Sequence, residues 1–391
     1  MTEKFDTIVI GLGAMGAATL YQVAKRGRKI LGIDRYSPPH AHGSSHGDTR
    51  ITRLACGEGA VYTQFARRSH EIWRELEART GEQLLVQNGL LVISGPGERA
   101  SAHGNPRFLD STIDASLCND VPHEVLTDRD IRRRFPAFNI TEQERGYYEP
   151  DAGFVFVEKC IETQLSLAKR LGATVHTNET MQCFDPRVDK VEVATDRATY
   201  AADNIVLAAG PWLPQLLPRR AALFTVRRQL LAWFRLADAG PTALARYRPD
   251  QFPVFYWQVP RKQAIYGFPW IGDGEPAIKL ATEQYDAETT PDKVDRTASS
   301  AELQSIYADY IADFLPGVSG QCVKSAVCLY TCVDDARFIV DRLPEHPRVI
   351  VASPCSGHGF KHSAAIGEAI AELATDGTPS RVSLEEFRMP D

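Results

Sequence analysis

Two side chains in the second half of the chain have the chemistry of a redox site. Lys279 is the only cation in the apolar run at 277–281. A buried ammonium there would stabilise negative charge that develops on oxygen during electron transfer. The alternative is a strand lysine whose head reaches water. Cys328 stands in the run at 325–331, where a thiol is either an apolar core residue or the covalent attachment point of a cofactor.

Two further cations, Arg53 and Lys361, lie far apart in the chain, each beside a glycine-rich loop. Together they could clamp a substrate carboxylate. Surface solvation is the alternative for either, although the position of Lys361 at a helix start argues against it there. His46 and His358 occupy the same two loops. Each is a candidate for catalysis or a histidine satisfied by the backbone, and both interpretations stay open.

The stretch at 5–35 predicts the element that positions these side chains. An apolar run ends in the glycine turn GLGAMG at 11–16, a helical run follows, and a second apolar run closes on Asp34. In a dinucleotide fold the first glycine makes the turn, the second admits a pyrophosphate and the third lets the helix pack on the strand. The helix N-terminus faces the phosphates and the acid holds a ribose hydroxyl. A plain glycine turn in an α/β core is the alternative.

Other patterns indicate two units that alternate along the chain. The fold class is α/β in a two-domain α+β arrangement, with a Rossmann-like FAD-binding domain and a second, antiparallel-sheet substrate domain. Aromatic-rich strand runs between 218 and 320 favour the second domain. We expect the discontinuous FAD-binding domain to comprise residues 1–84, 151–217 and 321–391, and the substrate domain to comprise residues 85–150 and 218–320. A glycine fingerprint this close to the first residue is typical of FAD-dependent enzymes.

Composition narrows the class of protein. The 391 residues are 43% hydrophobic and 24% charged with a net charge of −6, which suits a globular protein and argues mildly against nucleic acid as a partner. The eight cysteines show no C-x-x-C spacing, so neither a metal site nor a disulfide framework is indicated. No secretory leader or membrane-length apolar run is evident, and we expect a soluble cytoplasmic protein.

Five blocks in order carry a resemblance to a known family. They are GSSHGDTRITR at 43–53, GEG at 57–59, YGFP at 266–269, AVCLYT at 326–331 and SGHGFK at 356–361. Together they resemble the family of monomeric sarcosine oxidase and N-methyltryptophan oxidase, nearly from end to end. The resemblance implies a monomeric FAD-dependent amine oxidase whose small-molecule partners are an amino acid and oxygen, with no nucleic acid or membrane partner.

The resemblance also implies residue roles. FAD would be attached covalently through Cys328, Lys279 would activate oxygen, and Arg53 with Lys361 would grip the substrate carboxylate. The expected catalytic residues are Lys279, Arg50, His46 and Tyr330. The expected substrate-binding residues are Arg53, Lys361, Tyr266, Tyr256 and Glu283. The expected cofactor-binding residues are Gly11, Gly13, Met15, Gly16, Asp34, Arg35, Ser44, Thr49, Arg50, Val175, Gly210, Cys328, Gly357, Gly359, Phe360 and Lys361.

The departures from the family pattern lie around the substrate. Glu283 stands four residues after Lys279, where family members commonly carry histidine. This acid could meet a second amino group on the substrate, neutralise Lys279 or turn outward. Tyr256 stands where the resembled sarcosine enzyme has a smaller apolar residue, and Cys355 stands where the family often has a larger residue. We therefore expect oxidation of a secondary or N-alkylated α-amino acid to an imine with formation of hydrogen peroxide. The alternatives are an oxidase or dehydrogenase for a cyclic imino acid, glycated amino acid or diamine, and a flavoprotein that passes electrons to a partner.

Overall fold

The apolar runs at the N-terminal end pair in parallel and begin the first sheet of this computed structural model. The structure describes residues 3–96, 105–259, 263–272 and 274–390. Strands β1 (Lys4–Ile10) and β2 (Ile30–Asp34) lie side by side, with Val9 opposite Gly32. The strand order is β10-β11-β12-β1-β2-β9, and β19 joins β12 and β18. The remaining strands are β9 (Thr174–Thr177), β10 (Met181–Pro186), β11 (Val191–Thr195), β12 (Thr199–Leu207), β18 (Ile339–Leu343) and β19 (His346–Ser353).

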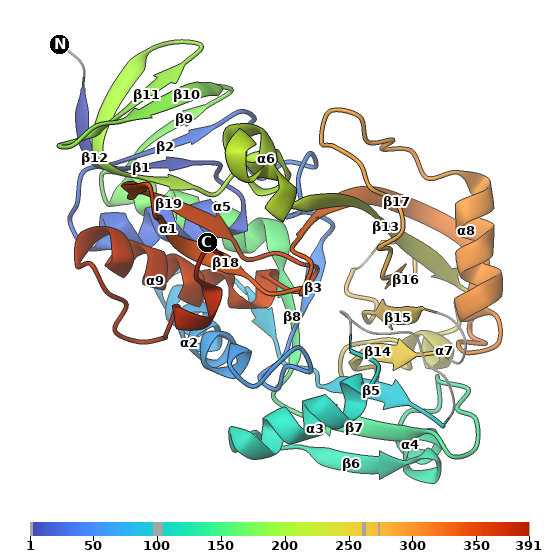
Figure 1. Ribbon diagram of the computed structural model, residues 1–391. Coiled ribbons are helices and arrows are strands. Elements are labelled where there is room, and N and C mark those ends of the chain that lie inside the picture. Colours follow the sequence, from blue (N-terminus) through green and yellow to red (C-terminus); the bar gives the residue numbers. More distant parts are fainter. Residues whose placement is uncertain (1–2, 97–104, 260–262, 273, 391) are drawn as a thin grey trace.

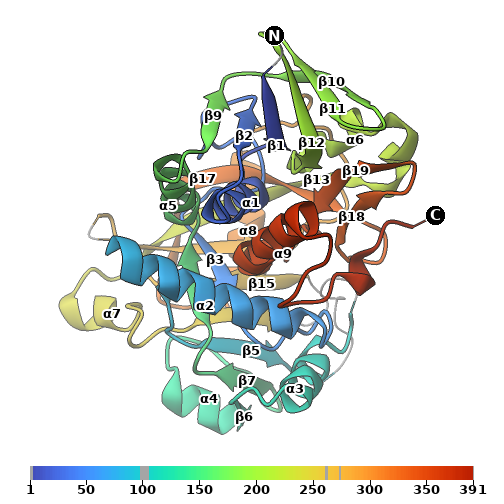
Figure 2. The same ribbon diagram turned by 90° about the vertical axis from the view of Figure 1, so that its left-hand side faces the viewer.

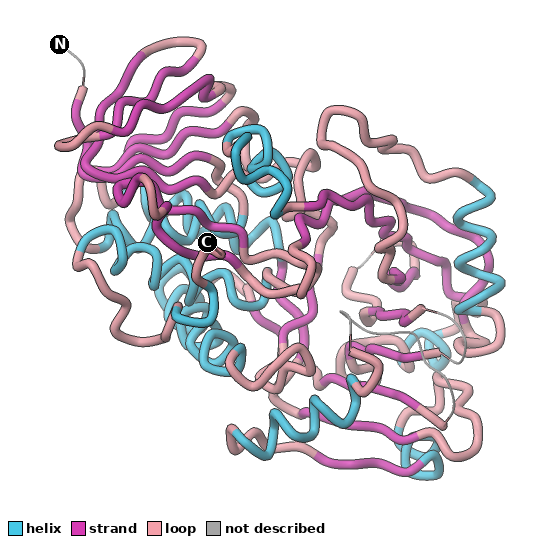
Figure 3. Tube along the Cα trace, in the orientation of Figure 1, coloured by secondary structure: helices cyan, strands magenta, loops and turns pink. Residues whose placement is uncertain are grey.

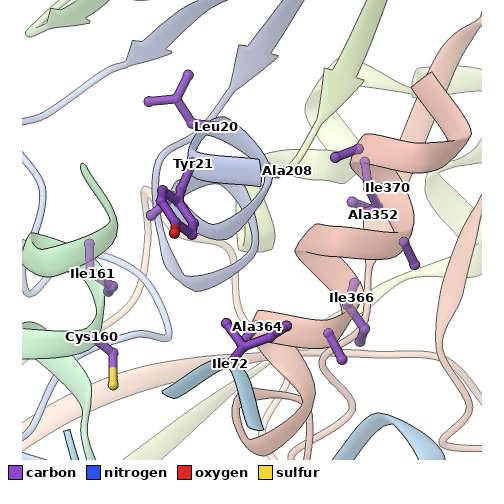
Figure 4. Close-up of a cluster of buried hydrophobic side chains, with 14 of the residues drawn as sticks. Leu20, Tyr21, Ile72, Cys160, Ile161, Ala208, Ala352, Ala364, Ile366 and Ile370 are labelled. Atoms are coloured by element: carbon purple, nitrogen blue, oxygen red, sulfur yellow. The ribbon is translucent and has the colours of Figure 1, made fainter. Parts of the chain in front are cut away.

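The four long helices are α1 (Ala14–Lys25), α2 (Tyr62–Thr80), α5 (Val157–Arg170) and α9 (Ser363–Thr375). Three of them lie beside one face of this sheet, and the fourth, α2, packs against α9 and α5 (Figure 2). Their apolar faces meet in a core that includes Leu20, Ile161, Ile366 and Ile370 (Figure 4). Both faces of the central strands are buried, which explains why these strands read as continuous apolar runs rather than as alternating ones.

The second sheet contains eight strands in the order β17-β13-β16-β15-β14-β5-β7-β6 (Figure 1). They are β5 (Leu90–Ser94), β6 (Glu124–Thr127), β7 (Arg145–Glu149), β13 (Thr225–Leu236), β14 (Val254–Gln258), β15 (Ala264–Gly267), β16 (Ala277–Thr282) and β17 (Val318–Cys332). All neighbouring pairs are antiparallel except β14 with β5, which run in parallel. The expected antiparallel sheet is therefore mixed at this one pair. Two segments far apart in the chain join there, so no tight hairpin dictates opposite directions.

Short elements complete the fold. A three-stranded sheet of β3 (Thr49–Thr52), β8 (Gly153–Phe156) and β4 (Leu85–Val86) lies between the two large sheets (Figure 1). Figure 3 shows the long helices grouped beside the first sheet and shorter helices around the second. The smaller helices are α3 (Phe108–Cys118), α4 (Asp128–Arg134), α6 (Leu213–Leu216), α7 (Pro241–Ala245) and α8 (Ser300–Ile306). Both α4 and α8 begin at a capping box, formed by Thr127 with Asp130 and by Ser299 with Glu302.

One boundary of the expected division differs from the strand pairing. Residues 321–332 were assigned to the FAD-binding unit, but β17 pairs with β13 from Val318 to Cys332. This segment belongs to the second sheet because the ladder of backbone hydrogen bonds runs along the whole strand. The other limits of the two units stay a prediction. In the described part of the chain, no helix has the length and apolar composition needed to cross a membrane.

Candidate functional site

The glycine turn after β1 brings helix α1 against the strand ends. Gly11 has a φ of +88°, in the left-handed region that favours glycine, and its N–H donates to the Ile33 carbonyl at 2.8 Å. A Cβ on Gly16 would lie 1.8 Å from the Gly11 carbonyl oxygen, so only glycine lets the helix approach this closely. The Asp34 carboxylate accepts from the backbone N–H of Leu12 at 2.7 Å and holds the turn in place.

A cavity of about 270 Å³ extends from this turn to the second sheet. Most of the predicted site residues line it: Gly11, Gly13, Met15, Asp34, Arg35, Ser44, Arg50, Arg53, Gly210, Tyr256, Tyr266, Glu283, Tyr330, Gly357, Gly359, Phe360 and Lys361. Its lining does not include Gly16, His46, Thr49, Val175, Lys279 and Cys328. Tertiary structure thus brings together residues that are more than 300 positions apart in the chain.

The residues outside the lining have other placements. Gly16 packs on the turn. Val175 lies on β9 beside Gly32, remote from the strands that carry the substrate-side residues. Cys328 is 1% exposed in β17, and the positive charge of Arg50 stabilises the thiolate form of its side chain. Burial raises the pKa of the Cys328 thiol, although the Arg50 charge opposes this shift.

Lys279 is a buried amine held by a loop. It projects from β16 and donates to the carbonyl oxygens of Gly47 at 2.7 Å and Thr49 at 2.6 Å. Burial and the charge of Arg50 hold the Lys279 pKa well below its ordinary value. The carboxylates of Asp48 and Glu158 act in the opposite direction and favour the charged form. The sequence interpretation in which this lysine head reaches water is therefore wrong, because the side chain is buried.

The loop that holds Lys279 is itself fixed on both sides. Glu158, in the first turn of α5, accepts from the backbone N–H of Gly47 at 2.7 Å. Arg50 donates to the carbonyls of Thr49 and Ser44, both at 2.9 Å. His46 lies in the same loop and is 5% exposed. Burial, reinforced by the Arg50 and Lys279 charges, lowers the His46 pKa to about 3, so this imidazole is neutral at physiological pH.

Arg53 and Lys361 meet at a shared carboxylate. Arg53 donates to both oxygens of Glu58 at 2.7 and 2.8 Å, and the Lys361 ammonium lies 3.3 Å from one of them. Burial lowers the pKa of Lys361, while Glu58 opposes that shift. Burial also disfavours the charged form of Arg53, but Glu58 outweighs it and raises the pKa. This wall of the cavity therefore carries two basic side chains that share one carboxylate.

Another part of the lining is built from phenols and an acid. The hydroxyls of Tyr266 and Tyr330 lie 3.4 Å apart. Tyr256 is 3% exposed and Glu283 is 4% exposed, and burial together with the Glu283 charge raises the pKa of the Tyr256 phenol. Burial raises the Tyr266 pKa to about 12, so this phenol is neutral at physiological pH. This part therefore supplies hydrogen-bond donors around one carboxylate.

Three carboxylates of the site were given no role by the sequence: Glu58, Glu149 and Glu158. Glu58 stands in the GEG block five residues after Arg53, and this proximity is the one signal that could have identified it. Glu149 accepts from the backbone of Leu54 at 2.6 Å, next to Arg53, although 95 residues separate the two. Glu158 had no local signal because its partner loop is more than 100 residues away in the chain.

The donor set suits a dinucleotide. Among the described residues, the buried Ser44 hydroxyl, the Trp212 indole N–H and the Ser353 hydroxyl have no hydrogen-bond partner, and all three residues line the cavity. Buried polar atoms are normally satisfied, so these atoms indicate a polar ligand. The close glycine turn supplies the backbone approach that a pyrophosphate needs. No group of acidic, histidine and cysteine side chains in the described ranges could hold a metal ion.

Comparisons with known proteins agree with this geometry. The model of the family described as FAD dependent oxidoreductase matches residues 6–373. Monomeric sarcosine oxidase of Streptomyces avermitilis is 36% identical over 380 residues, which cover 97% of this chain and 95% of the relative. N-methyl-L-tryptophan oxidase of Yersinia pestis is 33% identical over 388 residues, 98% of each chain. The solved structure of NikD, an amino acid oxidase essential for nikkomycin biosynthesis, superposes with a TM-score of 0.83 at 25% identity, covering 99% and 98% of the two chains.

Proposed function

Because the chain belongs to the family of FAD-dependent oxidoreductases, we propose that it oxidises a secondary or N-alkylated α-amino acid of the N-methyl type to an imine. Oxygen is the electron acceptor and hydrogen peroxide the second product. The observation that carries the proposal is the buried pair of Arg53 and Lys361, which faces the cavity that begins at the glycine turn. The names of the relatives, a sarcosine oxidase and an N-methyl-L-tryptophan oxidase, support the same substrate class.

The proposed binding site of FAD is the cavity that begins at the glycine turn. The turn at 11–16, Asp34 and the loop at 43–50 would hold FAD. When bound, FAD supplies the two-electron oxidation of the amine and transfers the electrons to oxygen. The protein then has to orient the substrate and exclude water. Arg53 and Lys361 orient the carboxylate, and burial of the amine among phenols and cations favours its free base.

Lys279 is assigned to the oxygen side of the reaction. A preorganised buried cation stabilises negative charge as it develops on oxygen without reorganisation of the solvent. The loop carbonyls of Gly47 and Thr49 hold the ammonium in one place. The other proposed catalytic residues are Arg50 and the neutral His46 on the cofactor side of the site, and Tyr330 on its substrate side.

We also propose covalent attachment of FAD through Cys328. Its support is the position of the thiol on β17 next to the Arg50 charge, which favours the thiolate against burial. Acid precipitation of the purified protein provides the test. Flavin absorbance should stay with the precipitated chain and should be released from Cys328→Ser. The link is refuted if flavin is released from both proteins.

A peroxide assay with a panel of amines tests the reaction. Sarcosine and other N-methyl amino acids should reduce the flavin under anaerobic conditions and yield hydrogen peroxide in air. Arg53→Ala and Lys361→Ala should lower kcat/KM for carboxylate substrates by at least about tenfold, because each removes a charged hydrogen bond of roughly 1.5–3 kcal/mol. Arg133→Ala, at an exposed position on α4, is the matched control. Equal activity in all three variants would reject the carboxylate site.

Reduction by an amine without peroxide would favour the second candidate, a flavoprotein that passes its electrons to a partner. A monomeric state and a cytoplasmic location stay predictions. Gel filtration with light scattering tests the first, and fractionation of the source cells tests the second.

A further inference from the structure

One peptide group lies between Glu158 and Lys279. It joins Gly47 to Asp48, and its carbonyl oxygen accepts from the Lys279 Nζ at 2.7 Å. Its N–H donates to the Glu158 Oε1 at 3.3 Å, and the preceding N–H, that of Gly47, donates to the same oxygen at 2.7 Å. In a trans peptide such as this one, the N–H and the carbonyl point in opposite directions. Two distant elements, α5 and β16, therefore meet across a single backbone unit.

Asp48 itself is fixed by contacts with two elements. Its φ of +68° lies in the left-handed region, which is uncommon for a residue other than glycine. Its carbonyl accepts from the N–H of Val157, at the start of α5, at 3.0 Å. Its carboxylate accepts from Lys324 on β17 at 2.7 and 2.9 Å. Such a backbone conformation persists where the surrounding contacts determine it, and here the carbonyls of the residues on either side both accept from Lys279.

Both carboxylates also favour the charged form of Lys279. Burial and the charge of Arg50 lower the Lys279 pKa, whereas the charges of Asp48 and Glu158 oppose this shift. Cys328 acts in the same direction as the carboxylates only as a thiolate, and burial raises its pKa. The titratable and charged groups around the lysine are Asp48, His46, Arg50, Glu158, Cys328 and Lys324, the last of which lies over the same Trp233 ring. Removal of either carboxylate should therefore make the lysine easier to deprotonate.

We propose that Glu158 and Asp48 are positioning residues for the oxygen half-reaction, which fix the peptide that holds Lys279 and keep its side chain cationic. The inference rests on the oxygen role proposed for Lys279. Glu158 acts through the 47–48 peptide, since a hydrogen bond at the N–H polarises the group and strengthens the one at its carbonyl. Asp48 acts through its backbone conformation and its charge. Neither side chain is part of the cavity lining, so reduction of the flavin by the amine should be spared.

Stopped-flow reoxidation of the photoreduced holoenzyme tests the positioning without any amine. Glu158→Ala loses both the acceptor and the charge and should slow reoxidation by at least about fivefold. Glu158→Gln keeps an acceptor oxygen for the backbone N–H groups and should recover part of this rate. Glu162→Gln changes an exposed carboxylate one turn further along α5 and should reoxidise as the parent does. Equal rates in Glu158→Ala and Glu162→Gln would overturn the inference.

The charge of the lysine has a separate readout in the NMR signals of lysine side chains labelled isotopically at Cε, recorded on the oxidised holoenzyme. Lys279→Met identifies the Lys279 signal by its absence. That signal should titrate at lower pH in Asp48→Asn than in the parent, and the decline of the reoxidation rate with rising pH should move in the same direction. Glu162→Gln should titrate as the parent does. Identical titration of Lys279 in the parent, Asp48→Asn and Glu158→Gln would contradict the role of the two carboxylates.

Flavin content and amine reduction distinguish positioning from a merely structural role. If Glu158→Ala loses FAD, Asp48→Asn and Glu158→Gln carry the test, because both preserve the shape of the side chain. Slowing of reoxidation and of amine reduction by the same factor in these two variants would overturn the inference. Reoxidation of Lys279→Met at the rate of the parent would refute the oxygen role and the inference with it. If no amine reduces the flavin while reoxidation and titration shift as expected, the proposed substrate fails and the positioning role holds.

Discussion

Glu149 connects the second sheet to the segment that carries Arg53, and its removal should weaken both stability and substrate binding. The residue is fully buried at the end of β7. Its carboxylate accepts three hydrogen bonds, from the backbone of Leu54 at 2.6 Å, the backbone of Ala55 at 3.2 Å and the hydroxyl of Tyr147 at 2.9 Å. Two of these donors directly follow Arg53 in the chain.

The cost of Glu149→Gln follows from the geometry of the donors. A carboxamide has a single acceptor oxygen, and in either orientation its NH₂ group faces a backbone N–H. One or two hydrogen bonds are lost and a buried N–H is left without an acceptor, at roughly 1–3 kcal/mol. Loss of the buried charge offsets part of this cost, since burial raises the Glu149 pKa. We expect a net loss of about 1–3 kcal/mol in the free energy of unfolding.

The sign of the pH dependence follows from the same shift. Because the folded pKa of Glu149 lies above its ordinary value of 4.5, the folded protein binds this proton more tightly than the unfolded chain. The stabilising contribution is complete below pH 4.5 and decreases as the pH rises through the folded pKa. Glu149→Gln lacks this contribution. The difference in stability between the parent and the variant should therefore be larger at pH 5 than at pH 8.

Urea unfolding followed by fluorescence measures these differences, and anaerobic titration with an N-methyl amino acid measures substrate affinity. Tyr147→Phe removes one of the three donors and should cost about 1 kcal/mol. Glu142→Gln changes an exposed carboxylate and should cost less than about 0.5 kcal/mol. If Glu149→Gln has the same free energy of unfolding as Glu142→Gln and binds substrate as the parent does, the carboxylate does not hold the Arg53 segment. That result would refute the reasoning.

Three other substitutions separate the parts of the site. Lys279→Met should slow reoxidation by oxygen by at least about tenfold in stopped-flow experiments, because it removes the buried cation, and should leave reduction by amine within about twofold. Equal slowing of both half-reactions would reject the oxygen role. Gly16→Ala places a Cβ 1.8 Å from the Gly11 carbonyl oxygen, so the purified protein should contain less FAD and unfold about 1–3 kcal/mol more easily. The control is Gly274→Ala, whose Cβ has no neighbour within 4 Å among the described residues. Full FAD content in Gly16→Ala would contradict the prediction. Burial lowers the His70 pKa from 6.5 to about 4. As the pH falls, this imidazole is therefore protonated in the unfolded chain before it is protonated in the folded protein. Stability should fall from pH 6.5 towards pH 4, by up to about 3 kcal/mol, and His70→Gln should flatten this decrease in urea unfolding.

The cofactor side of the site was accessible from the sequence because its signals are local. The turn at 11–16 needs small residues at fixed spacing, and this requirement is visible within one strand, turn and helix. The apolar runs around Lys279 and Cys328 likewise predicted strands, and both residues lie in strands. The roles of these two residues came from family resemblance, since a lysine or cysteine in a strand has ordinary alternatives.

The tertiary structure decided which charges meet. Glu58 binds Arg53, Glu149 binds the backbone of Leu54 after it, and Glu158 binds the Lys279 loop. Glu149 and Glu158 come from segments that are distant in the chain. The parallel pairing of β5 with β14 and the pairing of β17 with β13 likewise join segments that are distant in the chain. Local hydrogen bonds and side-chain spacing determine a turn or a strand within a few residues. A buried carboxylate has no such pattern, because its partner is set by packing across the whole fold and not by its neighbours in the chain.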